Sequence, residues 1–404
     1  MRSANLIFFT AIFTLSVWRA TAQIYDTNNI FVEPFASDGF SNQLQIVSDS
    51  LNNLFVLDGG NKLIKKITPD GNVSVFVGGG TGGLEGYGTN VSLAYTSFGA
   101  MTIDSSNTLW IIATLFNTTY LLSISNDGFV SIENASLPVG QTTLGIKGIC
   151  VDSFDNIYYY GGQYSPTNLT LFTNVIYRYS PGSYTVAPFA FVPIKSSTTL
   201  SDAFAIDSAN NIYFWGGNGF IYKIDPSGNV RTITGSIYSF DQDGGSTNSS
   251  FANVAAMAID NSGNLFLSCS NCVRKITQAL NSVTIAGSFS QSGNSDGVGS
   301  NALFSAASGV CVSQSSIYIA DSGNQRVRKI LINPVPISGT TTALNTYPGL
   351  TIAGIVNRAY QIQSSPDLIS WSIVTNLLLP SNPYLWFDPN PVSGNKFYRA
   401  VLLP

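Results

Sequence analysis

A short pattern that recurs along most of the chain constrains the fold more than any other feature of the sequence. Each copy runs from an apolar residue and an aspartate, through polar residues that include an asparagine, to an apolar and then an aromatic residue. Six copies begin at the following positions: Asp49, Asp104, Asp152, Asp207, Asp260 and Ser313. The copies are 48 to 55 residues apart, which fits a repeated four-stranded sheet and exceeds the period of helical repeats.

The strands that follow each copy predict a ring of sheets. A third strand and, after a glycine turn, a fourth strand can be read after most copies, as at residues 63–67 and 73–75. The sixth copy ends after its third strand, whereas residues 29–35 match the fourth-strand pattern. We therefore expect residues 29–35 to pair with residues 326–330 and close the ring; a loose N-terminal tail would leave a free sheet edge. The sequence predicts an all-β protein whose main part is a six-bladed β-propeller.

The last copy, residues 317–330, is the clearest. Two apolar strands flank an Asp-Ser-Gly-Asn turn, and Asp321 and Arg326 are expected to face each other across it as a structural ion pair. The sequence Ile-Tyr-Ile-Ala-Asp, the Gly-Asn turn and the strand Arg-Val-Arg-Lys-Ile resemble the NHL repeat. This resemblance implies an NHL-like propeller, a fold that in its relatives binds proteins or RNA and in a few cases acts as an amidating lyase.

Composition excludes several of these functions. The chain of 404 residues has no histidine, a formal charge of −4 and only 10% charged residues. A Ser-His-Asp triad and histidine-held metals, including the zinc of the lyase relatives, are therefore excluded. The acidic charge also argues against a nucleic-acid partner. We expect no catalytic residue, no metal and no cofactor, and we favour a protein that is not an enzyme.

The N-terminus predicts export. Residues 1–22 combine Arg2, an apolar stretch from Leu6 to Val17 and an Ala-Thr-Ala cleavage site, as in a signal peptide. The apolar stretch is too short to span a bilayer, and no later stretch qualifies. The expected domains are a signal peptide (1–22), the propeller (23–333), a linker (334–347) and a C-terminal module (348–404). The mature protein is expected to be a secreted or cell-surface monomer.

The four cysteines are interpreted in the light of export. Cys269 and Cys272 flank a short hairpin turn, and in an oxidising compartment they are expected to form a disulfide. A thioredoxin-like redox role is disfavoured because this Cys-x-x-Cys joins two strands instead of opening a helix. Cys150 and Cys311, on inner strands of opposite blades, are expected to stay separate buried thiols.

The repeat ends before residue 334, and short alternating segments follow. Six strands are predicted between residues 350 and 402, around a core that includes Tyr360, Trp371, Trp386 and Tyr398. This pattern predicts a small β-sandwich. The segment resembles C-terminal modules of exported bacterial repeat proteins, which implies surface delivery or retention, whereas a passive stabilising cap fits the sequence equally well.

Three functions remain open. The first is a non-enzymatic scaffold that presents a loop face of the propeller to a protein or another extracellular ligand. The second is a carbohydrate-binding protein, for which Trp110, Tyr158, Tyr160 and Trp215 are candidate ligand-binding residues, although such aromatic side chains more often pack between blades. The third is a calcium-dependent hydrolase like the lactonase propellers; the chain offers three glutamates for it: Glu33, Glu85 and Glu133.

Overall fold

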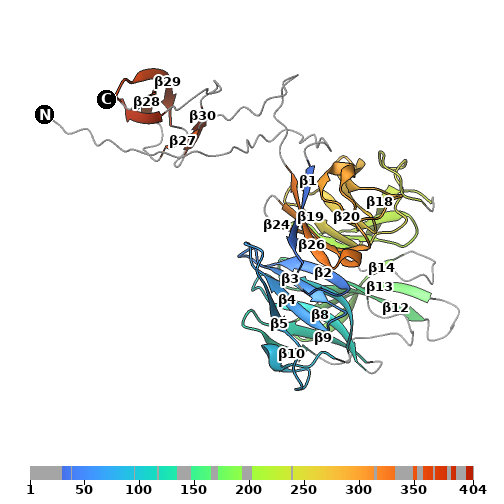
Figure 1. The fold of residues 1–404 in the computed structure, drawn as a ribbon. Helices are drawn as coiled ribbons and strands as arrows, with labels where there is room; N and C mark the ends of the chain where they lie inside the picture. Colours follow the sequence, from blue (N-terminus) through green and yellow to red (C-terminus); the bar gives the residue numbers. More distant parts are fainter. Residues whose placement is uncertain are drawn as a thin grey trace. The chain divides into compact units, whose positions relative to one another are not determined.

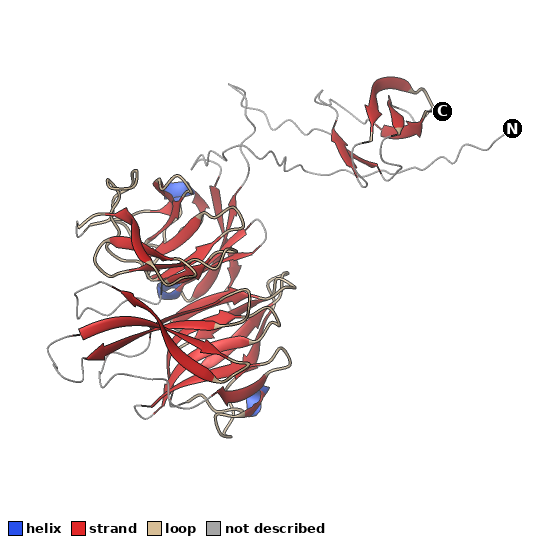
Figure 2. Cartoon of the chain, turned by 180° about the vertical axis from the view of Figure 1, so that it is seen from behind, coloured by secondary structure: helices blue, strands red, loops and turns tan. Residues whose placement is uncertain are grey.

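The computed structural model describes residues 30–37, 39–94, 96–115, 118–133, 147–164, 172–192, 203–237, 240–313, 316–332, 349–352, 358–366, 369–379, 384–387 and 397–403. The predicted signal peptide and linker lie outside these residues. One compact unit, Tyr25–Asn333, holds six antiparallel sheets, and the described strands after it belong to a second unit. Figure 2 shows that strands make up nearly all of the regular structure. The described residues include no helix that is long and apolar enough to cross a membrane.

Each of the six sheets, which we name blades 1 to 6, contains consecutive strands joined as neighbours (Figure 1). Blade 1 contains β2 (Gln43–Ser48), β3 (Leu54–Asp58), β4 (Leu63–Ile67) and β5 (Val73–Val77). Blade 2 contains β7 (Thr96–Ile103), β8 (Leu109–Leu115), β9 (Thr118–Ile124), β10 (Phe129–Glu133) and the short β6 (Gly86–Tyr87). Blade 3 contains β11 (Lys147–Val151), β12 (Ile157–Tyr164), β13 (Phe172–Ser180) and β14 (Thr185–Val192).

Blades 4 to 6 repeat the plan. Blade 4 contains β15 (Phe204–Ile206), β16 (Ile212–Trp215), β17 (Phe220–Ile224) and β18 (Val230–Gly235). Blade 5 contains β19 (Ala256–Ile259), β20 (Leu265–Cys269), β21 (Cys272–Ile276) and β22 (Ser282–Gly287). Blade 6 contains β24 (Ala307–Ser313), β25 (Ser316–Asp321), β26 (Arg326–Ile332), β1 (Ile30–Ala36) and the short β23 (Gly297–Val298). The described residues also include the short 3₁₀ helices η2 (Gly88–Asn90), η3 (Gly299–Asn301) and η4 (Ser322–Asn324).

The predicted closure by the N-terminal strand is confirmed. β1 is antiparallel to β26, with a register that runs from Ile30 opposite Ile332 to Ala36 opposite Val327. In Figure 1 the blue strand β1 lies beside the orange strand β26, from the other end of the unit. Ile30 and Val32 are buried in one apolar cluster with residues of blades 5 and 6, so residues from both ends of this unit share one core.

Apolar clusters fill the spaces between neighbouring blades. One cluster combines residues of blades 1 and 2, another residues of blades 3 and 4, and a third residues of blades 4 and 5. Since side chains on a strand alternate between the two faces of its sheet, each blade can pack against both neighbours. This arrangement explains why middle strands such as β3, β20 and β21 are buried along their whole length instead of on one face.

The second unit is smaller. It contains a two-stranded sheet of β27 (Gly349–Ile352) and β30 (Tyr384–Phe387), and a three-stranded sheet of β29 (Ser372–Leu378), β28 (Ala359–Ser365) and β31 (Phe397–Leu402). Two of the predicted strands, 371–375 and 377–379, are largely one strand, β29. The buried cluster contains the predicted Tyr360 together with Ile352, Ile362 and Leu379, and Tyr398 packs against it from a half-buried position.

The cysteines differ in part from expectation. Cys150 and Cys311 are separate, buried thiols, as predicted. Cys269 and Cys272 are also free and buried, so the predicted disulfide is not formed in this structure. They lie directly opposite each other on β20 and β21, and a hydrogen bond between them, together with burial, raises the pKa of the Cys269 thiol. Opposite residues of antiparallel strands are about 4.5–5.5 Å apart at Cα, within the reach of a disulfide. The crosslink therefore stays a prediction for the oxidised protein.

Candidate functional site

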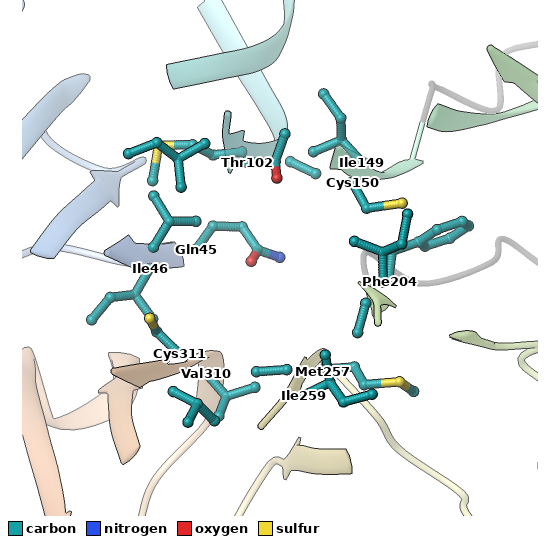
Figure 3. Close-up of a pocket in the computed structure, with 18 of the residues that line it drawn as sticks. Gln45, Ile46, Thr102, Ile149, Cys150, Phe204, Met257, Ile259, Val310 and Cys311 are labelled. Carbon is teal, nitrogen blue, oxygen red and sulfur yellow. The ribbon is translucent and has the colours of Figure 1, made fainter. Parts of the chain in front are cut away.

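A central channel is formed by the first strand of each blade. A cavity of about 260 Å³ is lined by residues of β2, β7, β11, β15, β19 and β24. Most of the wall is apolar or sulfur-containing, as Figure 3 shows for Ile149, Phe204 and Met257. Gln45 and Thr102 direct polar side chains into the ring of residues (Figure 3).

The polar groups of the channel are few. Gln45 is 8% exposed, and its amide has no hydrogen-bond partner among the described residues. The residues that line the cavity include no carboxylate. A central calcium held by carboxylates, as the lactonase hypothesis requires, therefore has no carboxylate ligands in the described channel wall.

The two channel thiols are poor nucleophiles. Burial raises the pKa of Cys311 to about 11, and burial next to Asp152 raises the pKa of Cys150 even further. Because the thiolate is the reactive form of cysteine, both side chains act as small apolar groups at neutral pH. The described channel wall thus offers shape, the Gln45 amide and the hydroxyls of Ser48 and Thr102, and among its lining residues none is prepared for acid–base or nucleophilic chemistry.

The channel opens into a second cavity at one end. This mouth cavity has a volume of about 330 Å³ and shares Ile206 and Ile259 with the channel wall. Its other lining residues belong to the turns between the first and second strands of blades 3, 4 and 5: Val151, Asp152, Ser153, Asp207, Ser208, Asn210, Asp260, Asn261 and Gly263. The cavity is therefore polar where the channel is apolar.

These turns are the recurring motif of the sequence, and we name them the Asp turns. In blade 4 the Asp207 carboxylate accepts hydrogen bonds from the N–H groups of Ala209 (3.0 Å) and Asn211 (2.8 Å) and from the Tyr213 hydroxyl (3.0 Å). Partial burial acts to raise the pKa of Asp207, but these hydrogen bonds outweigh it and hold the pKa below its usual value. The carboxylate is thus committed to the turn and stays ionised at neutral pH.

Neighbouring Asp turns are joined by hydrogen bonds that the sequence did not lead us to expect. The fourth residue of one turn reaches the second residue of the preceding turn: Asn107 accepts a hydrogen bond from the Ser50 N–H (2.9 Å) and donates one to the Ser50 hydroxyl (3.0 Å). Asn210 makes the same two contacts with Ser153, each at 3.0 Å. We name such a pair an inter-blade link.

Two further links vary the chemistry. Asp155 accepts hydrogen bonds from both the N–H (3.1 Å) and the hydroxyl (2.9 Å) of Ser105. Between blades 6 and 1, the Ser313 hydroxyl donates to the Asn52 side chain (2.9 Å). All four fourth-position residues have a left-handed backbone, with φ between 60° and 64°, which asparagine and aspartate tolerate better than other non-glycine residues.

The predicted aromatic candidates lie inside the blades. Trp110 and Tyr158 are buried, and each donates a hydrogen bond to the aspartate of its own Asp turn, Asp104 (2.8 Å) and Asp152 (3.1 Å) respectively. Tyr160 is buried and donates to Asn174. Trp215 is half-buried and donates to the Phe251 carbonyl (2.9 Å). These contacts place the four side chains in the packing and hydrogen bonding of the blades, and a role for them in ligand binding stays a prediction.

The predicted Asp321–Arg326 pair is present, but it is not the closest contact of either residue. The two residues are opposite in register, but Arg326 Nε is 3.9 Å from the Asp321 carboxylate, and its guanidinium lies nearer Asp296, at 3.3 Å. The main partner of Asp321 is Arg328, fully buried at 3.3 Å. Burial raises the pKa of Asp321 and lowers that of Arg328. In blade 1 the equivalent pair is Asp58 and Lys65, at 3.1 Å.

The connection before blade 5, which contains Asp241 and Asp243, binds an arginine. Arg274 of β21 is completely buried and lies 3.3 Å from Asp241 and 3.1 Å from Asp243. It also donates to the carbonyls of Ser250 (2.6 Å) and Gln242 (2.5 Å). Arg274 in blade 5 and Arg328 in blade 6 thus each fasten the long connection that precedes their own blade.

Comparison with known proteins supports the fold. No protein-family profile and no curated protein sequence matches the chain. Two similar solved structures are auxiliary nutrient binding proteins from Bacteroides thetaiotaomicron (14% identity, TM-score 0.56, 74% of this chain and 76% of that one) and Bacteroides ovatus (16%, 0.56, 75% and 76%). A third, from B. thetaiotaomicron, has no known function (18%, 0.57, 75% and 76%). At these identities the likeness shows the six-bladed propeller fold alone.

Proposed function

We propose that this protein is an exported, non-enzymatic binding protein built on an NHL-like propeller, and that the mouth cavity is its ligand site. One observation carries the proposal: the cavity joins an apolar channel to a rim of polar turn residues from three blades. Small-molecule sites combine apolar walls with a few placed polar groups in this way. Two similar folds are nutrient-binding proteins, which supports a small polar ligand.

We propose a non-enzymatic role because the aspartates at the cavity and the thiols of the channel are not available for catalysis. The three aspartates at the cavity, Asp152, Asp207 and Asp260, each accept several hydrogen bonds from their own turn, so none is an available general base. The channel thiols are protonated at neutral pH. Binding uses the remaining groups of the rim without requiring any of these residues to react.

For the location, the oligomeric state and the C-terminal module, we propose what the sequence predicts. We propose a secreted or cell-surface monomer whose ligand is extracellular, and a C-terminal module that forms a small β-sandwich. A glycan stays a possible ligand class because Phe154, next to Ser153 at the cavity, is 77% exposed, and exposed aromatic rings can pack against sugar rings.

Blocking the cavity tests the proposal. Asn261 lines it from an exposed turn position and makes no hydrogen bond with a described residue, so the variant N261W should fill the mouth without loss of fold. The matched control is S106W, an exposed Asp-turn position in blade 2 that does not line the cavity. Sugars, sugar acids, amino acids and primary amides would be screened by thermal shift at millimolar concentration.

We expect at least one ligand class to raise the melting temperature of the wild type and of S106W but not of N261W. A ligand at 100 times its Kd stabilises a protein by about 2.7 kcal/mol, an easily measured shift. If every ligand that binds the wild type also binds N261W equally well, the mouth cavity is not the site.

A further inference from the structure

The set of inter-blade links has a gap at the mouth cavity. Links join blade 6 to 1, 1 to 2, 2 to 3 and 3 to 4. Among the described residues, no such link joins blade 4 to 5 or blade 5 to 6, the two junctions on either side of the blade 5 turn. The next link would join the fourth residue of the blade 5 turn to Ser208 of blade 4. That fourth residue is Gly263, which has no side chain, and both residues line the mouth cavity.

The backbone at the gap retains the geometry of a link. Gly263 has φ of 76°, in the same left-handed region as Asn52, Asn107, Asp155 and Asn210. Like its counterparts Ser50, Ser105 and Ser153, Ser208 is exposed. Unlike them, its N–H and hydroxyl have no hydrogen-bond partner among the described residues. The Ser208 N–H and hydroxyl are therefore available to a ligand in the mouth cavity. Such a ligand would occupy the position that the Asn107 and Asn210 carboxamides occupy in two other links.

We propose that the mouth cavity binds a ligand through a primary carboxamide group, which occupies the place of the missing asparagine side chain. Its oxygen would accept from the Ser208 N–H, and its NH₂ group would donate to the Ser208 hydroxyl, as Asn107 does with Ser50 and Asn210 with Ser153. This inference rests on the mouth cavity being the ligand site.

The charges around the cavity favour a neutral group. A carboxylate can make the same contacts, as Asp155 does with Ser105. However, Asp152, Asp207 and Asp260 all line the cavity, and like charges close together in a partly desolvated site repel each other. A primary amide keeps both hydrogen bonds without this repulsion. The amide can belong to a small molecule or to an asparagine or glutamine side chain of a peptide.

The variant G263N tests the gap directly. A Cβ at Gly263 would meet the Gln278 side chain at 3.0 Å, a contact that the flexible end of Gln278 can relieve. We expect the new asparagine to link to Ser208 and to raise the melting temperature by roughly 2–4 °C. G263A, which adds the Cβ without the amide, should lower it because alanine is strained at positive φ. In the double variant S208A/G263N most of the gain should disappear.

Binding is measured with three probes by ligand-observed NMR on the full mature chain. Propionamide represents a small amide, N-acetyl-L-asparagine N-methylamide a peptide side chain, and N-acetyl-L-aspartate N-methylamide the charged equivalent. We expect one or both amides to bind the wild type, the aspartate probe to bind at least threefold more weakly than its amide counterpart, and G263N and S208A to weaken amide binding about tenfold or more. Whichever amide binds identifies the source.

The outcomes separate this inference from the proposed function. If other ligands bind in a way that N261W abolishes but neither amide binds, the carboxamide inference is wrong and the mouth cavity remains the site. If the amides bind G263N as well as the wild type, the missing link is not where they bind. If no ligand is sensitive to N261W, both proposals fail.

Discussion

A variant that lacks residues 30–35 is expected to melt many degrees below the intact protein. The deletion removes most of β1, which pairs with β26 on one side and β23 on the other. It also removes Ile30 and Val32, which are 1% and 0% exposed, from the core they share with Phe304 and Ile330. The deletion exposes the edge of β26 and also opens the core. The loss in free energy of unfolding should therefore exceed that of an ordinary core substitution, which is about 2–5 kcal/mol.

Two point variants of the same strand control for nonspecific effects. V32D places a charge in the shared core and should reproduce much of the deletion's effect. E33Q changes a partly exposed residue whose carboxylate is 4.0 Å from Lys329, and it should change stability by less than about 1 kcal/mol. The melting temperatures of the three variants would be measured by calorimetry. An unchanged melting temperature for the deletion would mean that β1 does not close the ring.

The second large effect is expected from R274M. Methionine retains much of the apolar stem of the arginine, but it removes the charge and the guanidinium, whose Cζ lies 4.4 Å from the centre of the Phe251 ring. Asp241 and the carbonyls of Gln242 and Ser250 then lose a buried donor. Removing one partner of a buried ion pair costs about 3–5 kcal/mol. Urea unfolding should report a loss of this size.

R326M is the matched control. Arg326 is more exposed, and its nearest partner, Asp296 at 3.3 Å, is itself one-third exposed. Pairs of this kind contribute about 0–1 kcal/mol. Equal losses in R274M and R326M would contradict the view that Arg274 fastens the connection before blade 5.

The propeller could be predicted because its signal is repeated. One strand-and-turn pattern, seen six times, fixed the number of blades, and the interrupted sixth copy indicated that the N-terminal strand must complete it. One of the two arginine partners of Asp321 was predicted, and the closer one was not. Arg326 is opposite in register, but Arg328, two residues further along the same face of the strand, reaches the carboxylate from a buried position.

The mouth cavity was not predicted from the sequence, for a physical reason. Aromatic residues drew attention because they bind ligands in many proteins, yet Trp110 and Tyr158 hold the aspartates of their own turns. The useful signal was smaller: serine at the second turn position and asparagine or aspartate at the fourth in blades 1 to 4, with Gly263 at the fourth position in blade 5 and Ser316 in blade 6. This pattern can be interpreted only with the structure, because the fold brings the fourth position of one turn next to the second position of the preceding turn.

The most direct test of the closed six-bladed ring is a crosslink between its two ends. Phe31 and Leu331 are opposite each other in the β1–β26 pair and are not buried, so the double variant F31C/L331C should form a disulfide on mild oxidation, detectable by mass spectrometry of peptides. The control F31C/K329C, displaced by two residues, should crosslink much less. A dominant disulfide in the control, or none in either variant, would contradict the register and the closure on which this account depends.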